Sequence, residues 1–262
     1  MLAPWTGHPP TPQQVAAAPS ITHLVLLDID GTLLAGVGPA PNAHQHSAFR
    51  AALRECWGVD AGLEDVEHAG KTDLWILRDL HQHTGCALPV EGALAAAAAR
   101  MEALCAAAPD PGAGLALLPG ARELLAALRA HDCAACGLVT GNLQSIAHRK
   151  LGALGLGAAP GELVCGGFGS DAEDRAELVR VAVARARAHL PGLPTTLRVF
   201  HVGDTPRDLE AAHRAGVEGL GVATGKFSLA ELKAASFEGQ VVLQNLADVP
   251  AVLRVLGLGE GV

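Results

Sequence analysis

The sequence predicts a doubly wound, Rossmann-like α/β core with an α-helical domain inserted into it. From residue 119 onward, β-rich runs alternate with helical segments of ten or more residues, as the crossovers of a parallel sheet require. Residues 36–116 instead carry Ala, Leu, Glu and Arg at amphipathic spacing, with almost no β-branched runs. With 262 residues, half of them apolar, the chain can bury a large core. We therefore assign residues 21–35 and 117–262 to the core and 36–116 to a helical cap.

The amino-terminal part of the chain divides into a leader, a strand and the inserted helices. Residues 1–20 hold five prolines and no apolar period, which predicts a disordered leader. Residues 24–27 are all aliphatic, which indicates a strand buried on both faces. A Pro, Asp and Gly cluster at 109–114 is suited to a hinge at the far end of the cap. Between them, amphipathic spacing predicts cap helices over 45–57, 72–83 and 90–108.

The rest of the core follows the alternating pattern. Charged and apolar residues at helical spacing predict crossover helices, and short runs of Val, Leu and Gly between them predict parallel strands. The expected helices cover 121–130, 145–154, 175–189 and 206–215, and the expected strands cover 134–140, 163–165, 197–202, 219–222 and 241–243.

Composition excludes several classes of protein. The 19 basic and 27 acidic residues give a net charge of −8 without a basic block, which argues against a nucleic-acid partner. No apolar stretch approaches the ~20 residues of a membrane span, so we expect no membrane partner. Six cysteines without scaffold spacing, and no basic-then-apolar leader, predict reduced thiols and a cytoplasmic location.

Two carboxylates, Asp28 and Asp30, stand directly after the first predicted strand, followed by Gly31. Residues i and i+2 of an extended chain project to the same side, so both acids could face one site at the carboxyl edge of the sheet. A tight turn after Asp28 would separate their roles, one on a metal and the other over a substrate. The alternative interpretation is a turn whose acids are merely solvated.

The strand predicted at 134–140 ends in Thr140, Gly141 and Asn142, just before a helix. A phosphate oxygen placed there would meet a hydroxyl, backbone N–H groups and a helix amino terminus. The same three residue types are also ordinary turn and N-cap residues. Alone, this motif leaves the two interpretations equally open.

A third predicted strand ends in Asp204, and Asp208 follows one helical turn later, after a Pro at the start of the helix. Helix capping is the alternative role for both acids. Together with Asp28 and Asp30, they would place four carboxylates at one edge of the sheet, where mutual repulsion requires a compensating cation. Mg²⁺ is suited to this site, because it prefers oxygen ligands and combines a few carboxylates with substrate phosphate.

These motifs resemble those of the haloacid dehalogenase-like superfamily, and more narrowly its phosphoglycolate phosphatase-like branch with a helical, C1-type cap. The resemblance covers about residues 20–255 and rests on three ordered motifs, which are Asp28-Ile29-Asp30-Gly31-Thr32, Leu138-Val139-Thr140-Gly141-Asn142 and Gly203-Asp204-Thr205-Pro206-Arg207-Asp208. It implies that Asp28 is the nucleophile that becomes an aspartyl phosphate. It also implies that Asp30 protonates the leaving alkoxide and then activates water.

The resemblance further implies how the metal and the phosphate are held. Mg²⁺ would bind the Asp28 carboxylate, the Asp30 backbone carbonyl and Asp204, with Asp208 in support. Thr140 and the amides after it would hold the phosphoryl oxygens.

The resemblance also implies a Lys or Arg that neutralises the phosphate, often in a Lys-Pro dipeptide. This sequence contains no Lys-Pro. The candidates are Arg175 and Lys150. Lys150 lies ten residues past Thr140, which predicts that it points away from the site. We therefore favour Arg175, which opens the next helix near the catalytic edge.

In the cap, Gly70 precedes Lys71 and Thr72 at a predicted helix start. Similar segments in capped relatives lie over the active site, so Lys71 could meet a substrate carboxylate or phosphate. Plain helix capping is the equal alternative.

The expected function is Mg²⁺-dependent hydrolysis of a small phosphorylated metabolite by a monomer or homodimer. Asp30 favours this over dehalogenation or phosphonate cleavage, because the resemblance implies that those relatives lack the second acid. Two alternatives stay open, a sugar phosphomutase of the same architecture and a catalytically idle member that binds ligands or acts as a scaffold.

Overall fold

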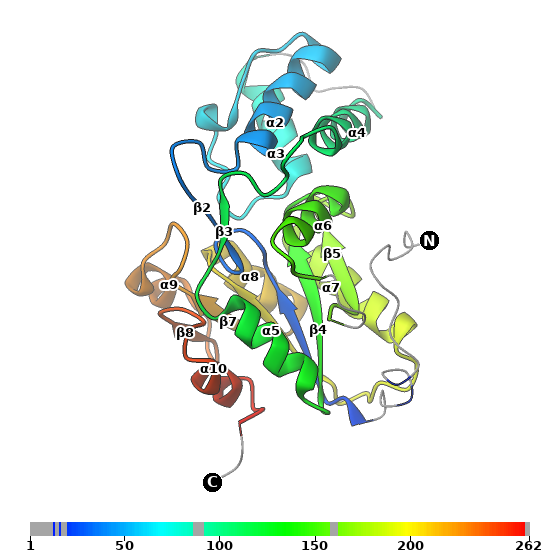
Figure 1. Cartoon of the computed structure of the whole chain (residues 1–262), viewed down its shortest axis with the longest axis vertical. Helices are drawn as coiled ribbons and strands as arrows, with labels where there is room; N and C mark the ends of the chain where they lie inside the picture. The colour runs from blue at the N-terminus through cyan, green and yellow to red at the C-terminus, as the bar shows by residue number, and fades with distance from the viewer. Residues whose placement is uncertain (1–12, 14–15, 17–19, 86–91, 158–161, 260–262) are drawn as a thin grey trace.

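A six-stranded parallel sheet, seen in the computed structural model of Figure 1, has the strand order β5-β4-β1-β6-β7-β8. The structure describes residues 13, 16, 20–85, 92–157 and 162–259. Its strands are β1 (His23–Leu27), β4 (Ala134–Thr140), β5 (Cys165–Phe168), β6 (Arg198–Gly203), β7 (Glu218–Val222) and β8 (Val241–Leu243). The α/β prediction is confirmed. Chain order reverses at β1, between β4 and β6, which is where ligands bind in open parallel sheets.

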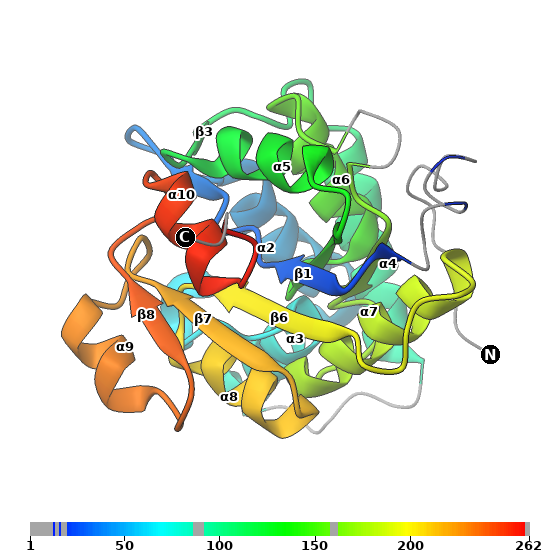
Figure 2. The same cartoon turned by 90° about the horizontal axis from the view of Figure 1, so that it is seen from below.

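Helices cover both faces of the sheet, as Figure 2 shows. They are α5 (Ala121–Ala130), α6 (Gln144–Ala153), α7 (Arg175–His189), α8 (Pro206–Ala215), α9 (Leu229–Ala235) and α10 (Val249–Val255). Alternation along β1 separates two cores, because Val25 and Leu27 pack in the cluster with α5 and α10, while Leu24 and Leu26 pack in the one with α7 and α8. The central strand is therefore apolar on both faces from Leu24 to Leu27, directly before Asp28.

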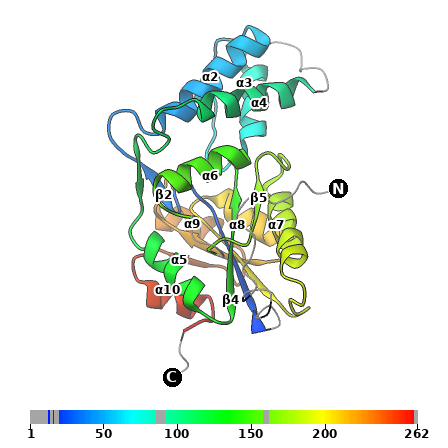
Figure 3. The ribbon, with the colours of Figure 1, turned by 45° about the vertical axis from the view of Figure 1, so that its right-hand side comes forward.

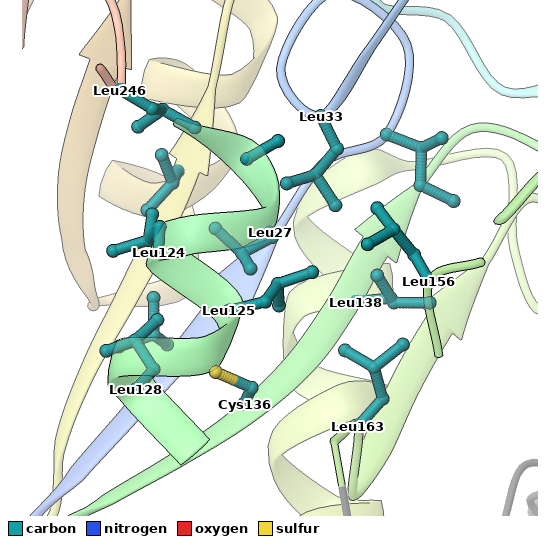
Figure 4. Packing of buried hydrophobic residues seen from close by; sticks show 14 of the residues in the cluster. Leu27, Leu33, Leu124, Leu125, Leu128, Cys136, Leu138, Leu156, Leu163 and Leu246 are labelled. Atoms are coloured by element: carbon teal, nitrogen blue, oxygen red, sulfur yellow. The ribbon is translucent and has the colours of Figure 1, made fainter. Parts of the chain in front are cut away.

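Leucines from α5 fill the first of these cores (Figure 4). Leu124, Leu125 and Leu128 lie on one side of the helix and meet Leu27 and Leu138 of the sheet. Each of these side chains is buried, and full burial of a leucine stabilises a fold by about 1.5–3 kcal/mol. This packing holds the carboxyl ends of β1 and β4 in a fixed relation.

The cap contains α2 (Ala43–Trp57), the short 3-10 helix η2 (Leu63–Asp65), α3 (Asp73–His83) and α4 (Ala93–Ala106). These helices enclose a separate apolar cluster that includes Phe49, Leu77 and Met101. Leu143 and Ile146, at the start of α6, belong to the same cluster, so the cap is seated on that end of α6 (Figure 3). The cap therefore covers the carboxyl edge of the sheet.

Two short strands absent from the sequence prediction carry the chain into and out of the cap. They are β2 (Leu34–Gly36) and β3 (Leu115–Leu117), which pair antiparallel, with Leu34 opposite Leu117. Three residues are too few to show a period, which is why the sequence did not reveal them. The helices α9 and α10, seven residues each, were missed for the same reason.

The strand expected at 163–165 was placed too early, since β5 begins at Cys165 and continues through two glycines. Glycine is depleted in strands, so the sequence pattern did not indicate that the strand extends over these residues. Here glycine is needed, because a Cβ on Gly167 would lie 2.0 Å from the carbonyl oxygen of Leu178 in α7.

Two of the predicted segments lie partly outside the described residues. Of the expected leader the structure describes residues 13, 16 and 20 alone, and of the helix expected at 90–108 it describes residues from 92 onward. In the described part of the chain, no helix combines the length and hydropathy needed to cross a membrane.

Candidate active site

The three predicted motifs meet at the carboxyl edge of the sheet. Asp28 follows β1, Thr140 ends β4, and Asp204 follows β6, and these strands are direct neighbours. Together with Asp30 and Arg175 they line a cavity of about 330 Å³ between the sheet and the cap. That volume is at the lower end of the range for small-molecule sites.

Three buried carboxylates stand close together in or beside this cavity. Asp28, Asp204 and Asp208 each offer an oxygen within 4.8 Å of the others. Burial raises the pKa of Asp28 to about 6, although Arg175 acts against it, and burial followed by repulsion from Asp208 and Asp28 raises the pKa of Asp204 to about 8. Further positive charge would stabilise the ionised cluster, and its oxygen atoms fit a hard cation such as Mg²⁺.

Arg175 supplies part of the missing charge. It is the first residue of α7, where Asp174 caps the helix by accepting the N–H of Ala176. Its Nη2 lies 2.9 Å from Asp28 and its Nε 2.7 Å from Asp208. Burial alone would lower the pKa of Arg175, but the surrounding carboxylates raise it, so the guanidinium stays charged.

Asp208 is already fully bonded by protein groups. Its Oδ2 accepts the backbone N–H of Thr205 at 2.9 Å and the Thr205 hydroxyl at 2.6 Å, which forms a capping box. Its Oδ1 lies near Arg175 Nε and 3.1 Å from Nε2 of His201. Although burial acts the other way, Arg175 and His201 hold the pKa of Asp208 well below its usual range. Asp28 and Asp204 are therefore the two carboxylates with oxygens left for a cation.

Lys150 points toward Asp30 from behind the cavity wall, so the expectation that it points away from the site is wrong. Nζ lies 3.0 and 2.9 Å from the two carboxylate oxygens of Asp30. Lys150 is the seventh residue of α6, and helical side chains lean toward the amino terminus of their helix, so its long stem points back toward the sheet edge. Burial raises the pKa of Asp30, but Lys150 and then Asn142 outweigh it and lower the pKa below its usual value.

The Thr140 motif is built around Asn142. The Asn142 amide nitrogen donates to Asp30 at 2.6 Å and to the Thr140 hydroxyl at 2.9 Å. Thr140 and Gly141 line the cavity together with Asn142. The three residues therefore share one wall of the cavity, and the Asn142 side chain is bonded to Asp30.

In the cap, Lys71 lines the cavity but forms an ion pair with Asp79, and its Nζ lies 5.2 Å from the ring centroid of Trp75. Thr72 is the N-cap of α3, where its hydroxyl accepts the N–H of Trp75 and donates to the Glu173 carbonyl at 3.1 Å. Helix capping, one of the two alternatives, thus describes Thr72, which also joins the cap to the core.

Sequence reasoning missed two polar cap residues, Gln45 and Asp73. The amide nitrogen of Gln45 donates to Asp73 at 3.1 Å and to Asn142 Oδ1 at 3.0 Å. Asp73 also accepts the backbone N–H of Leu143 at 2.8 Å, and burial raises its pKa to about 7. Its place after the N-cap was a usable signal, whereas Gln45 stands in an ordinary amphipathic helix.

Gly141 lies against the backbone of the cap, where its carbonyl accepts the Asp73 N–H at 2.7 Å, and we expect Gly141→Ala to reduce activity by about 10- to 100-fold. A Cβ there would lie 2.3 Å from the Lys71 carbonyl oxygen, so the cap must shift. Displacements near 1 Å can cost 10²-fold in rate. Turnover of p-nitrophenyl phosphate would measure the loss. Gly152→Ala is the matched control, because a Cβ on Gly152 meets nothing within 4 Å. Equal activity of both variants would contradict the prediction.

The chain is similar in sequence to one family model and in fold to several solved structures. A family model described as haloacid dehalogenase-like hydrolase matches residues 22–216. A solved hydrolase from Pseudomonas syringae is 22% identical with a TM-score of 0.59, over 89% of this chain and 98% of that one. A predicted phosphoglycolate phosphatase from Haemophilus somnus is 17% identical, with the same TM-score and coverage. CbbY from Rhodobacter sphaeroides, in complex with phosphate, is 17% identical with a TM-score of 0.58, over 87% of this chain and 96% of that one. No curated protein matches the chain significantly.

Proposed function

Because the chain belongs to the haloacid dehalogenase-like hydrolases, we propose that it is a Mg²⁺-dependent phosphatase acting on a small phosphorylated metabolite through an aspartyl-phosphate intermediate. The observation that carries this proposal is the cavity shared by Asp28, Asp30, Thr140, Arg175 and Asp204. Its walls combine a nucleophile, a second acid, a hydroxyl donor and a fixed cation, which is the set that phosphoryl transfer requires.

In the first step, an oxygen of Asp28 attacks phosphorus while the bond to the ester oxygen breaks. Arg175, 2.9 Å from Asp28, keeps this carboxylate ionised and neutralises charge on the phosphoryl oxygens. Thr140 donates its hydroxyl to those oxygens. Asp30 gives its proton to the departing alkoxide.

In the second step, Asp30 takes a proton from water as the water oxygen attacks phosphorus. The bond between phosphorus and Asp28 breaks, which releases phosphate and restores the carboxylate. Mg²⁺, held by Asp28, Asp204 and the Asp30 carbonyl, would supply Lewis-acid polarisation of the phosphoryl group when bound. Asp208 supports the turn that carries Asp204.

Release of phosphate tests the proposal. We expect Mg²⁺-dependent turnover of p-nitrophenyl phosphate that EDTA abolishes. A panel of phosphoglycolate, sugar phosphates, nucleotides and phosphoamino acids would then identify the substrate class. Absence of turnover across the panel would overturn the proposal, and transfer of phosphate within a sugar phosphate without its release would indicate a mutase.

Protons should compete with Mg²⁺ at this site. Because the pKa of Asp204 is about 8 and that of Asp28 about 6, both carboxyls become protonated as the pH falls across this window. Binding the metal must then release those protons. We therefore expect the half-saturating Mg²⁺ concentration to rise as the pH falls, by up to about tenfold per pH unit for each proton released. Titrations of activity with Mg²⁺ between pH 6 and 8 would measure this. A half-saturating concentration that stays constant would contradict it.

A further inference from the structure

Lys150 lies behind the second acid and outside the catalytic cavity. The Asp30 side chain is 42% exposed and lines the cavity, whereas that of Lys150 is 4% exposed. Among the described residues, Arg175 lines the cavity and Lys150 does not. A phosphate in the cavity would therefore meet Arg175, while Lys150 touches the carboxylate that faces it.

Four acceptor atoms surround the Lys150 ammonium group. Besides both oxygens of Asp30, Nζ lies 2.9 Å from Asn142 Oδ1 and 2.5 Å from Gln45 Oε1. Burying an ammonium group is unfavourable unless such partners are in place. Lys150 thus holds Asp30 in one orientation only while the whole set is assembled.

One of those acceptors belongs to the cap. Gln45 is on α2, and it contacts Lys150 through its carbonyl oxygen and Asn142 through its amide nitrogen, which lies 3.0 Å from Asn142 Oδ1. Asn142 in turn donates to Asp30 at 2.6 Å. Hydrogen bonds thus run without a break from Gln45 through Asn142 and Lys150 to Asp30. They link the position of the cap to the orientation of the Asp30 side chain.

We propose that Lys150 and Gln45 are positioning residues, which orient the Asp30 carboxyl group so that it donates its proton to the leaving alkoxide when the cap is seated on the core. This inference rests on the proposed phosphatase activity. It differs from a phosphate-binding role for Lys150, because it places the effect on departure of the leaving group and leaves phosphate affinity to Arg175.

Two substrates of similar shape separate these roles. Nitrophenolate leaves without a proton, whereas the more basic phenolate of phenyl phosphate gains from one. The ratio kcat/KM reports the chemistry up to loss of the leaving group, so hydrolysis of the intermediate does not enter. We expect Lys150→Met to lower kcat/KM for phenyl phosphate at least about tenfold more than for p-nitrophenyl phosphate. The inhibition constant of inorganic phosphate should stay the same.

Four further variants serve as references for the difference between the two substrates in Lys150→Met. Asp30→Asn defines the full leaving-group effect, and Gln45→Leu should show the same substrate bias more weakly. Lys150→Arg should restore part of the loss, because it keeps the charge. Lys233→Met, at an exposed site in α9, should show no bias. If Lys150→Met does not fold, Gln45→Leu carries the test.

Two outcomes would overturn the inference. Equal losses on both substrates would indicate a general structural role, and a weaker inhibition by phosphate would indicate phosphate binding by Lys150. Failure of the proposed function has a different signature, since the unaltered enzyme would then turn over neither substrate.

Discussion

Asp28→Asn is expected to lower kcat on p-nitrophenyl phosphate by on the order of 10⁴-fold or more, as loss of a catalytic nucleophile does. The amide oxygen cannot form the acyl phosphate, and it is a poorer ligand for Mg²⁺. Arg175 would keep its partner Asp208, so the fold should survive. Phosphate release and hydroxylamine trapping of the acyl phosphate would both measure the loss.

Asp132→Asn provides the matched control for this variant. Asp132 is an exposed carboxylate just before β4, at the opposite edge of the same sheet. Its replacement should leave turnover unchanged. A rate for Asp28→Asn close to that of the control would refute Asp28 as the nucleophile.

Arg175→Met is expected to lower the free energy of unfolding by about 3–5 kcal/mol in the absence of metal, as breaking a buried ion pair does. The substitution leaves Asp28, Asp204 and Asp208 together without their cation. Because Mg²⁺ would neutralise Asp28 and Asp204, its addition should recover part of the loss. Urea unfolding with Mg²⁺ and with EDTA would measure both effects.

Two further variants provide reference values for the stability of Arg175→Met. Arg180→Met, at an exposed position of the same helix, should change stability by less than about 0.5 kcal/mol, because surface ion pairs contribute little. Arg175→Lys should lie between them, since a single ammonium cannot contact both Asp28 and Asp208 as the guanidinium does. An Arg175→Met variant as stable as the Arg180 control would show that the guanidinium does not stabilise the carboxylate cluster.

Local pattern was enough to predict the sheet edge and its acids. The aliphatic run before Asp28 and the β-rich run before Asp204 both signal strands, and parallel strands present their carboxyl ends at one edge. The crossover helices over residues 121–130, 175–189 and 206–215 begin and end where their periodicity indicates. Strand order then brings Asp28, Thr140 and Asp204 together.

The partners of Asp30 could not be predicted in this way. Lys150 reaches it across 120 positions of sequence, and Gln45 reaches Lys150 across 105. Neither contact leaves a periodic signal, because each joins elements far apart in the sequence, and the contact of Gln45 also depends on how the cap is seated on α6. Counting residues along the helix placed Lys150 too far away, since it ignored the lean of helical side chains and the length of the lysine stem.

The paired strands β2 and β3 bring the two ends of the cap side by side, with Leu34 opposite Leu117 and Gly36 opposite Leu115. The chain thus leaves the core and returns to it at neighbouring positions, and a short turn between β2 and β3 is long enough to replace the cap. Such an insertion is modular. The cap can therefore change in length or sequence while the strands that precede Asp28 and Asp204 keep their positions.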